Sequence, residues 1–477
     1  MDKTVKITFG TSGWRAVIAD GFTFDNVGLV TQAIADYVKI ESKTPEIIIG
    51  YDTRFLSKEF AESSAWVLSA NKIKVLLCNR DTPTPVLAYQ VINRKLSGAI
   101  NFTASHNPPE YNGIKFSPAY GGPASKQVTS AIEKQIEFLR GTGRRLEINN
   151  FKNVESAIIK KFDPQKSYLK RIKEFIDLEK IKKAKLNIAV DCLYGTGRGY
   201  LDFILTDNCF NLKVLHNYLD PYFGGYAPEP NKMCLRELIK LVKKEKFNLG
   251  LALDGDADRF GIIDKGGIFF NANQIITLLF HYLLKTRPKA KTVARTISTT
   301  HMIDAIALKH GIEVIETPVG FKYIGYEISK GECIIGGEES GGLSVQGHIP
   351  EKDGILACLL VAEMVAVEKK SLREILKSLY KQYGCFYSDR INSSFKEKEK
   401  KKIFLRLQKI STQHNFLGLK IKTKNFIDGY KFIFTDNSWV MFRLSGTEPV
   451  IRCYFEAQST KQLNYLKEAS AKILQIK

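Results

Sequence analysis

The 477-residue sequence predicts an α/β protein with three α/β units, followed by a more β-rich and basic tail. The first observation is that short runs of β-branched and apolar residues alternate with longer helical patterns, as in βαβ units. The second is that three of these runs open into loops dense in glycine and polar residues, at 103–113, 254–261 and 336–342. Because ligands of α/β sheets bind at the carboxyl ends of strands, the three loops are expected to face one shared cleft.

The strand candidates are nearly continuous in apolar residues, as expected for strands that helices cover on both faces. In chain order they are 46–52, 73–78, 98–103, 186–191, 247–254, 292–296 and 332–336. The apolar stretch at 355–362 is too short to span a membrane and is expected to be a core helix. No internal sequence repeat accompanies the three units, so their equivalence rests on the order of strands and helices alone.

Changes in composition mark the expected domain boundaries. They are a polar, basic stretch at 141–155, a DKGG turn at 264–267 and a change to a β-rich pattern at 383–392. The predicted domains, each with one candidate functional loop, are domain I at 1–151, domain II at 152–264, domain III at 265–380 and domain IV at 381–477.

The formal charge of +21 is concentrated toward the end of the chain. From residue 379 onward there are 19 Lys and Arg against 8 Asp and Glu, so the last segment is expected to bind an anion. Much of the excess lies in the run KEKEKKK at 396–402, whose mixed signs are typical of an exposed helix face. Aromatic residues are not interleaved with this run, which argues against a nucleic-acid surface.

The cysteines and the apolar segments of the sequence indicate where in the cell the protein is expected. Eight cysteines lie far apart without a Cys-x-x-Cys pair, which argues against a zinc cage or a disulfide framework. No apolar stretch is long enough for a membrane span, and no apolar signal region follows the first lysines. We therefore expect a cytoplasmic protein with no membrane partner.

The DGDADR loop carries the first chemical motif. Asp254, Asp256 and Asp258 alternate directly after an apolar run, and a turn at Gly255 lets them converge on one hard cation such as Mg²⁺. An EF-hand is excluded, because positions six and twelve of that loop hold Arg259 and Lys265 rather than Gly and Glu. The alternative is a solvated acidic turn.

The second loop, TASHNPP, places Ser105 between a strand and a proline pair that stiffens the turn. Its hydroxyl could act as a nucleophile or phosphoryl carrier, with His106 positioning it. The G-x-S-x-G elbow of a hydrolase is absent. A structural role for the Ser-His pair remains an alternative, and Lys115 could be either a general base or a solvated lysine.

Two further loops carry groups for recognition. GGEESGG at 336–342 sets Glu338, Glu339 and Ser340 among glycines, which suits sugar hydroxyls or a merely flexible turn. RLSGTEP at 443–449 combines Arg443 with two hydroxyls and a glycine, the donors that a phosphate monoester needs, and Arg452 follows on a strand-like run. A surface turn is the alternative for this loop.

Taken together, the four loops resemble those of the α-D-phosphohexomutases, the family of phosphoglucomutase, phosphomannomutase and phosphoglucosamine mutase. The resemblance spans the chain in the family's order and includes FGTSGWR at 9–15, GYDTR at 50–54, TPTP at 82–85 and TPVGFK at 317–322. It implies three α/β domains with mixed sheets and a smaller C-terminal α+β domain around a central cleft.

The resemblance also implies a role for each candidate residue. Ser105 would carry the phosphoryl group, and its phosphate oxygen would bind Mg²⁺ together with Asp254, Asp256 and Asp258. The residues serving the reacting phosphate and proton transfers would be Arg15, His106, Lys115 and Arg259. The substrate-binding residues would be Lys322, Glu338 and Ser340 on the sugar side, and Arg443, Ser445, Gly446, Thr447 and Arg452 on the distal phosphate.

The implied reaction interconverts hexose 1-phosphate and hexose 6-phosphate through a phosphoserine and a hexose 1,6-bisphosphate, in a monomer or homodimer without nucleic-acid partners. Glucose is favoured, with mannose as a further substrate. Phe321 and Lys322 resemble phosphoglucomutases, whereas Gly342 stands where several phosphomannomutases and phosphoglucosamine mutases have histidine. The alternatives are a phosphoglucosamine mutase, a Mg²⁺-dependent D-x-D sugar phosphatase and a basic nucleic-acid binder.

Overall fold

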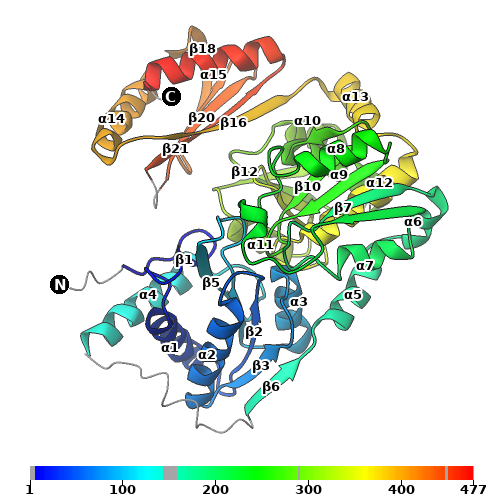
Figure 1. Cartoon of the computed structure of the whole chain (residues 1–477). Helices are drawn as coiled ribbons and strands as arrows, with labels where there is room; N and C mark the ends of the chain where they lie inside the picture. Colours follow the sequence, from blue (N-terminus) through cyan, green and yellow to red (C-terminus); the bar gives the residue numbers. More distant parts are fainter. Residues whose placement is uncertain (1–5, 143–157, 288–289, 446–448, 476–477) are drawn as a thin grey trace. The chain divides into compact units, whose positions relative to one another are not determined.

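The computed structural model describes residues 6–142, 158–287, 290–445 and 449–475. It divides into two compact units (Figure 1): residues 1–290 with 320–372, and residues 291–319 with 373–477. The predicted fold class is confirmed, because three α/β regions with mixed sheets precede a region built on an antiparallel sheet.

The first sheet has six strands in the order β1-β5-β4-β2-β3-β6. The strands are β1 Trp14–Val17, β2 Glu46–Tyr51, β3 Lys74–Cys78, β4 Gly98–Phe102, β5 Tyr111–Pro118 and β6 Ile159–Phe162. The helices are α1 Phe24–Glu41, α2 Ser57–Ala70, α3 Thr84–Arg94 and α4 Lys126–Gly141. Strands β2, β3, β4 and β6 run parallel, while β5 and β1 add an antiparallel edge.

Helices cover both faces of this sheet, which explains its continuous apolar strands. Along β2, Ile47 and Ile49 join the core under α1, α2 and α4, whereas Ile48 between them packs with Leu87 and Val91 of α3. Successive side chains of a strand point to opposite faces, so an apolar residue is needed at every position.

The second sheet has the order β11-β10-β9-β7-β8. Its strands are β7 Asn187–Asp191, β8 Asn211–Leu215, β9 Leu249–Leu253, β10 Phe260–Asp264 and β11 Ile268–Phe270. The accompanying helices are α5 Gln165–Lys173, α6 Leu178–Ala184, α7 Leu201–Thr206, the 3-10 turn η3 Phe223–Gly225 and α8 Arg236–Lys244. The DKGG turn joins β10 and β11 within this sheet. The domain boundaries proposed from the sequence stay a prediction.

The third α/β region contains a parallel pair, β12 Thr292–Thr296 and β13 Glu313–Thr317, and an antiparallel pair, β14 Cys333–Glu338 and β15 Gly342–Val345. Its helices are α9 Ala272–Thr286, α10 Met302–His310, α11 Phe321–Ser329, α12 Gly354–Glu368 and α13 Leu372–Tyr383. The core helix expected at 355–362 is confirmed, since α12 is buried from Gly354 to Ala366.

The C-terminal region is an antiparallel sheet in the order β16-β21-β20-β19-β18-β17, packed against two helices. Its elements are β16 Tyr387–Ser394, the 3-10 turn η4 Glu397–Glu399, α14 Lys400–Ser411, β17 Asn415–Phe416, β18 Leu419–Asn425, β19 Tyr430–Phe434, β20 Trp439–Leu444, β21 Val450–Ala457 and α15 Thr460–Leu474. The more β-rich tail that the sequence predicts is thus confirmed.

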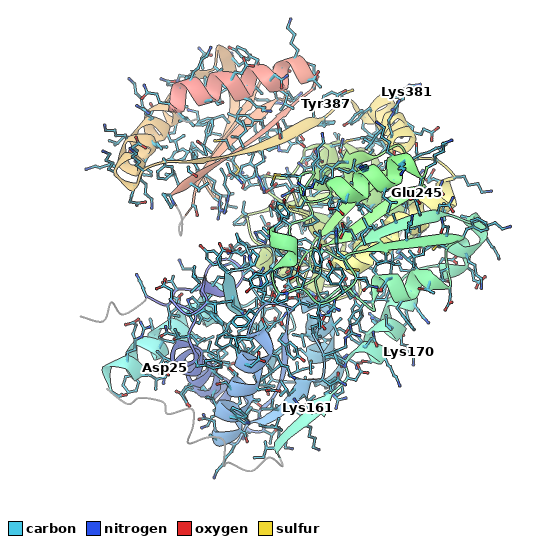
Figure 2. All side chains as sticks on the ribbon, in the orientation of Figure 1. Asp25, Lys161, Lys170, Glu245, Lys381 and Tyr387 are labelled. Carbon is cyan, nitrogen blue, oxygen red and sulfur yellow. The ribbon has the colours of Figure 1, made fainter. Side chains whose placement is uncertain are left out.

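The lysines and the cysteines lie where the composition leads us to expect them. Lysines such as Lys161, Lys170 and Lys381 are exposed (Figure 2), and the eight cysteines are all free. Among the described residues, no helix has both the length and the apolar character that a membrane span requires.

Replacing a leucine inside α12 is expected to destabilise the first unit. Leu360 is fully buried, so Leu360→Ala should cost about 2–5 kcal/mol through lost burial and a residual cavity. Calorimetry should show the thermal midpoint lowered by several degrees. The matched control, Leu308→Ala, removes a leucine that is 84% exposed and should leave the midpoint nearly unchanged. Equal shifts in the two variants would contradict the buried position of α12.

Candidate active site

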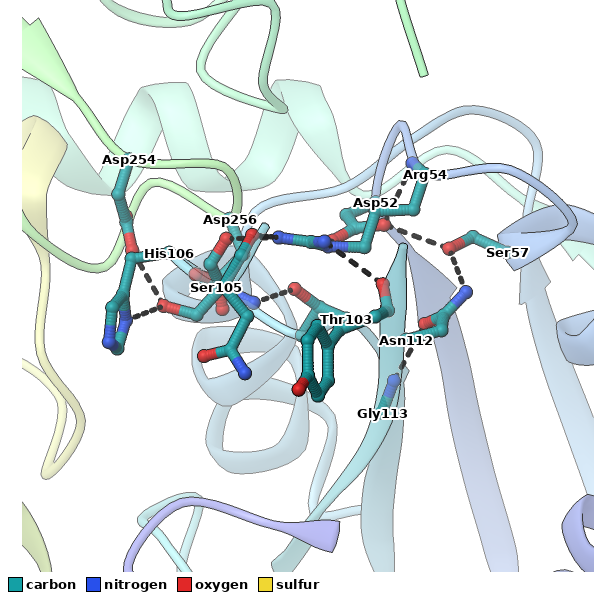
Figure 3. Close-up of polar contacts among 12 residues, drawn as sticks. Asp52, Arg54, Ser57, Thr103, Ser105, His106, Asn112, Gly113, Asp254 and Asp256 are labelled. Atoms are coloured by element: carbon teal, nitrogen blue, oxygen red, sulfur yellow. Dashed lines mark hydrogen bonds and ion pairs between the residues drawn. The ribbon is translucent and has the colours of Figure 1, made fainter. Parts of the chain in front are cut away.

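The serine loop, residues 103–110, leaves the carboxyl end of β4 and places Ser105 in a buried position. Ser105 adopts a left-handed backbone conformation with φ of 52°, and its N–H donates to Thr103 Oγ1 at 2.8 Å. Its hydroxyl donates to Asp254 Oδ2 at 2.7 Å and lies 3.3 Å from His106 Nδ1 (Figure 3). Such a backbone is uncommon for a residue with a side chain and is typical of functional sites.

The acidic loop, residues 254–259, connects β9 to β10 and folds into a tight turn. One carboxylate oxygen from each of Asp254, Asp256 and Asp258 lies within 4.8 Å of the others, and all three residues are buried. The convergence expected from their alternate spacing is thus present. A Cβ atom on Gly255 would lie 2.6 Å from the Ser105 carbonyl oxygen, so the close approach of the two loops requires glycine here.

Two lysines bring positive charge to these carboxylates. Lys115 on β5 places its Nζ 2.5 Å from Asp256 Oδ2 and 2.7 Å from Asp258 Oδ2. Lys352, in the turn before α12, lies 3.2 Å from Asp258 Oδ2 and 2.7 Å from Glu351 Oε1. Burial alone would lower the pKa of Lys115, but the carboxylates of Asp256 and Asp258 outweigh it, so the pKa is raised and the ammonium stays charged.

The carboxylates still have unused coordinating capacity. Asp256 Oδ1 and Asp258 Oδ1 are buried without a hydrogen-bond partner. Burial, together with the charges of Asp256 and Asp258, raises the pKa of Asp254 well above its usual range. For Asp258, burial alone would raise the pKa, yet Lys115, Lys352 and Arg259 hold it low. Unpaired buried carboxylate oxygens beside one another are costly without a cation, and oxygen donors suit Mg²⁺, so these residues fit a divalent metal.

Arginine and histidine complete the surroundings of Ser105. Arg15 Nη1 donates to Asn107 Oδ1 at 2.6 Å, which ties β1 to the serine loop, and burial and Arg259 lower its pKa to about 10. Burial, followed by the charges of Arg259, Arg15 and other nearby cations, lowers the pKa of His106 well below its usual value. His106 is therefore a neutral ring whose nitrogen can accept a hydrogen bond.

The GGEESGG loop reaches the acidic loop from β14 and β15. The N–H of Phe260, the first residue of β10 directly after the acidic loop, donates to the Gly341 carbonyl at 3.2 Å. Glu338 is buried and accepts from the Gly320 N–H at 2.9 Å, and burial raises the pKa of its carboxyl. Ser340 beside it is half-buried. Lys322, half-buried on α11, places its Nζ 5.2 Å from the centre of the Tyr323 ring.

The surroundings of Gly342 explain why this loop has glycine at a position where histidine would be larger. A Cβ atom there would lie 2.4 Å from Lys352 Cδ, in the path of the side chain that reaches Asp258. Sequence analysis missed Lys352. In the sequence, its motif EKDG at 351–354 looks like an ordinary charged turn. Only the folded structure shows that Lys352 reaches Asp258 of the acidic loop.

The RLSGTEP loop belongs to the second unit. Arg443 on β20 and Arg452 on β21 are paired in register, so their side chains start from the same face of the sheet. Arg443 Nε donates to Asp428 Oδ2 at 3.0 Å, and the same oxygen accepts from the Val319 N–H at 3.0 Å. Ser445 is buried, with its N–H donating to the Val450 carbonyl. Gly446 and Thr447 lie outside the described residues. Two arginines on one face of the sheet give that face positive charge, which suits a contact with phosphate.

Four family models match the chain in consecutive order. They are described as phosphoglucomutase/phosphomannomutase alpha/beta/alpha domain I at residues 6–140, domain II at 166–267 and domain III at 271–383, and the C-terminal domain at 391–473.

Curated relatives match over nearly their full length. A phosphoglucomutase/phosphomannomutase of Thermococcus kodakarensis is 30% identical, covering 98% of both chains. A phosphoglucomutase of Komagataeibacter xylinus is 29% identical over 97% of this chain and 89% of its own. A phosphoglucosamine/phosphogalactosamine mutase of Sulfurisphaera tokodaii is 29% identical over 98% and 99%. The relatives therefore share a family but differ in their sugar.

A solved structure gives the same result for the fold. The crystal structure of a Thermus thermophilus protein assigned as a phosphomannomutase is 31% identical and superposes with a TM-score of 0.84, covering 99% of this chain and all of its own. With four consecutive domain models and relatives aligned from end to end, this chain belongs to the phosphoglucomutase/phosphomannomutase family of α-D-phosphohexomutases.

Proposed function

We propose that this family member is a phosphoserine-dependent mutase that interconverts glucose 1-phosphate and glucose 6-phosphate, and also acts on mannose phosphates. The observation that carries the proposal is the Ser105 hydroxyl, held 2.7 Å from Asp254 inside a cluster of three buried carboxylates. A hydroxyl in this setting is suited to carry a phosphoryl group, because its environment is built to hold both a cation and negative oxygens.

In the proposed step, the bond between phosphorus and Ser105 Oγ breaks while a bond from phosphorus to a sugar hydroxyl oxygen forms, and the proton of the sugar hydroxyl ends on Ser105 Oγ. When bound, Mg²⁺ would be held by Asp254, Asp256, Asp258 and a phosphoserine oxygen and would neutralise charge on the transferring group. Return of the second phosphoryl group from the bisphosphate to Ser105 completes the exchange of positions. Hexose 1,6-bisphosphate is therefore also the expected activator of an unphosphorylated chain.

The remaining charged residues support this transfer. Lys115 and Arg259 keep positive charge beside the acidic loop, and Arg15 contacts the serine loop through Asn107. Neutral His106 lies 3.3 Å from the Ser105 hydroxyl, and in the tautomer that carries the proton on Nδ1 it can donate to the serine oxygen while the hydroxyl donates to Asp254, which helps to orient the oxygen. These groups would bind the reacting phosphoryl oxygens and assist proton transfer.

A mutase must present both ends of its sugar to one serine, so it needs recognition groups that work in both orientations. We assign sugar hydroxyls to Lys322, Glu338 and Ser340, because the buried Glu338 carboxylate belongs to a loop that hydrogen-bonds to the residue directly after the acidic loop. The distal phosphate would bind at strands β20 and β21 and the loop between them. The residues that contact it would be Arg443, Ser445, Gly446, Thr447 and Arg452.

The preference for glucose rests on Phe321, Lys322 and Gly342. Lys352 passes over Gly342 and lies 5.2 Å from the Phe321 ring centre, so histidine at 342 would be incompatible with the position of Lys352. A coupled assay with glucose, mannose and glucosamine 1-phosphates, each with its bisphosphate, tests the assignment. The highest kcat/KM should be for glucose 1-phosphate. A highest value for the glucosamine ester would replace our assignment by a phosphoglucosamine mutase.

Ser105→Ala should abolish nearly all mutase turnover while the chain stays folded, because the phosphoryl acceptor oxygen is removed. Ser378→Ala, at an exposed position on α13, is the matched control and should retain turnover. Steady-state rates and far-ultraviolet circular dichroism check both. If Ser105→Ala turned over at near-normal rates, or if mapping placed the phosphoryl group on Asp254 as in a D-x-D phosphatase, the assignment of Ser105 would be wrong.

Asp256→Asn should weaken Mg²⁺ binding and lower turnover by orders of magnitude, since one of three converging carboxylates is lost. Isothermal titration with Mg²⁺ and activity at increasing Mg²⁺ measure the two effects. Asp207→Asn, at an exposed position after α7, supplies a charge-matched control and should change neither. Full wild-type turnover after removal of metal by EDTA would contradict the metal assignment.

Arg443→Ala should reduce kcat/KM for both the 1-phosphate and the 6-phosphate. A charge-assisted contact with phosphate contributes roughly 1.5–3 kcal/mol, so the loss should be on the order of ten- to a hundredfold. Kinetics in both directions provide the measurement. Lys420→Ala, which removes a charge from β18 of the same sheet, is the control and should have little effect. Impairment of only one isomer would exclude a distal phosphate site shared by both orientations.

A further inference from the structure

Arg54 makes the densest set of contacts to the serine loop, although it lies about fifty positions earlier in the chain. It follows β2, and its side chain is fully buried. Nη1 donates to the carbonyls of Pro108 at 2.7 Å and Tyr111 at 2.9 Å. Nη2 donates to the carbonyls of Ser105 at 2.8 Å and Asn107 at 2.6 Å. Four backbone carbonyls of one short segment therefore converge on one guanidinium. Figure 3 shows Arg54 beside Asp52 and the serine loop.

The remaining contacts hold the guanidinium itself in place. Nε donates to Asp52 Oδ2 at 3.1 Å, so all five N–H groups of the side chain are used. The plane of Arg54 also lies over the buried ring of Phe223, 4.9 Å from its centre, in the turn η3 of the second α/β region. A lysine could supply the charge at this position but not five donors in a planar fork.

The same cluster continues to the strand that carries Lys115. Asp52 Oδ1 accepts from the Ser57 hydroxyl at 2.8 Å, and Ser57 accepts from Asn112 Nδ2 at 2.9 Å. Asn112 Oδ1 in turn accepts from the Gly113 N–H at the start of β5. Both ends of the serine loop are thus tied to one buried ion pair, Asp52 with Arg54.

We propose that Arg54 is a positioning residue for the phosphoryl-carrying serine, holding residues 105–111 so that the Ser105 hydroxyl points at the acidic loop. This inference rests on the proposed function. It follows from the left-handed backbone of Ser105, which costs free energy and persists only where surrounding contacts enforce it. Backbone carbonyls that are turned away from water require donors, and the fully buried Arg54 side chain supplies them to four residues of the segment 105–111. A displacement of about 1 Å of a reacting oxygen can cost a hundredfold in rate.

Arg54→Lys tests the proposal, because it keeps the positive charge opposite Asp52 and removes the planar fork. Arg295→Lys is the matched control. Arg295 is equally buried and ion-paired, with Asp304 and Glu316 in the second unit, and none of its hydrogen bonds involves the serine loop. Three readouts on the full chain are needed: amide hydrogen exchange by residue, the thermal midpoint, and kcat and KM with glucose 1-phosphate.

In Arg54→Lys, exchange of the Ser105, Asn107 and Tyr111 amides should rise about tenfold or more while the rest of the first unit stays protected. kcat should fall about ten- to a hundredfold with KM within about threefold of wild type. Arg295→Lys should show neither change. Unchanged loop exchange, unchanged kcat, or a rise in KM at constant kcat would overturn the proposal.

A merely structural role would be visible as faster exchange throughout the first unit with a lower thermal midpoint, and this result would also overturn the proposal. Failure of the proposed function is a separate outcome. If the wild-type chain showed no mutase turnover, the exchange measurement would still decide whether Arg54 holds the loop, because it does not depend on activity.

Discussion

Three buried carboxylates within 4.8 Å of one another are the constraint around which the first unit is organised. Like charges at this separation in a buried setting repel strongly and lose their hydration, so they must be balanced by cations or by protonation. The chain supplies Lys115 from β5 and Lys352 from the turn before α12, and still leaves two carboxylate oxygens without a hydrogen-bond partner. The site is therefore built to receive a further cation, and the serine loop is held against it.

The glycines and charged residues around this cluster follow from the same constraint. Gly255 allows the acidic loop to approach the Ser105 carbonyl, and Gly342 leaves a path for Lys352. Arg54 neutralises Asp52 and at the same time saturates the carbonyls of the serine loop. These glycines and charged residues both balance charge and hold the two loops in position. Catalysis of phosphoryl transfer depends mainly on these two effects, because the protein chiefly positions the reacting groups and stabilises their charge.

Much of this could be predicted from the sequence, because the information is local. Every strand candidate is confirmed within about two residues, and the Asp254, Asp256 and Asp258 spacing led directly to a converging cluster. The strands that were not predicted, such as β5 and β13, contain polar residues or glycine, and their pairing depends on neighbouring strands. The sequence placed Arg54 in the GYDTR motif without a role and did not single out Lys352, because both residues act through contacts with residues 51 and 94 positions away along the chain. The chemistry assigned to single residues stays a proposal.

The most direct test of the account is transfer of a labelled phosphoryl group from glucose 1,6-bisphosphate to the unphosphorylated chain in the presence of Mg²⁺. Peptide mapping by mass spectrometry should locate one phosphoryl group on Ser105, and addition of unlabelled glucose 1-phosphate should discharge it to the sugar. Label on any other residue, or label on Ser105 that is released as inorganic phosphate rather than returned to sugar, would contradict a mutase that works through this serine.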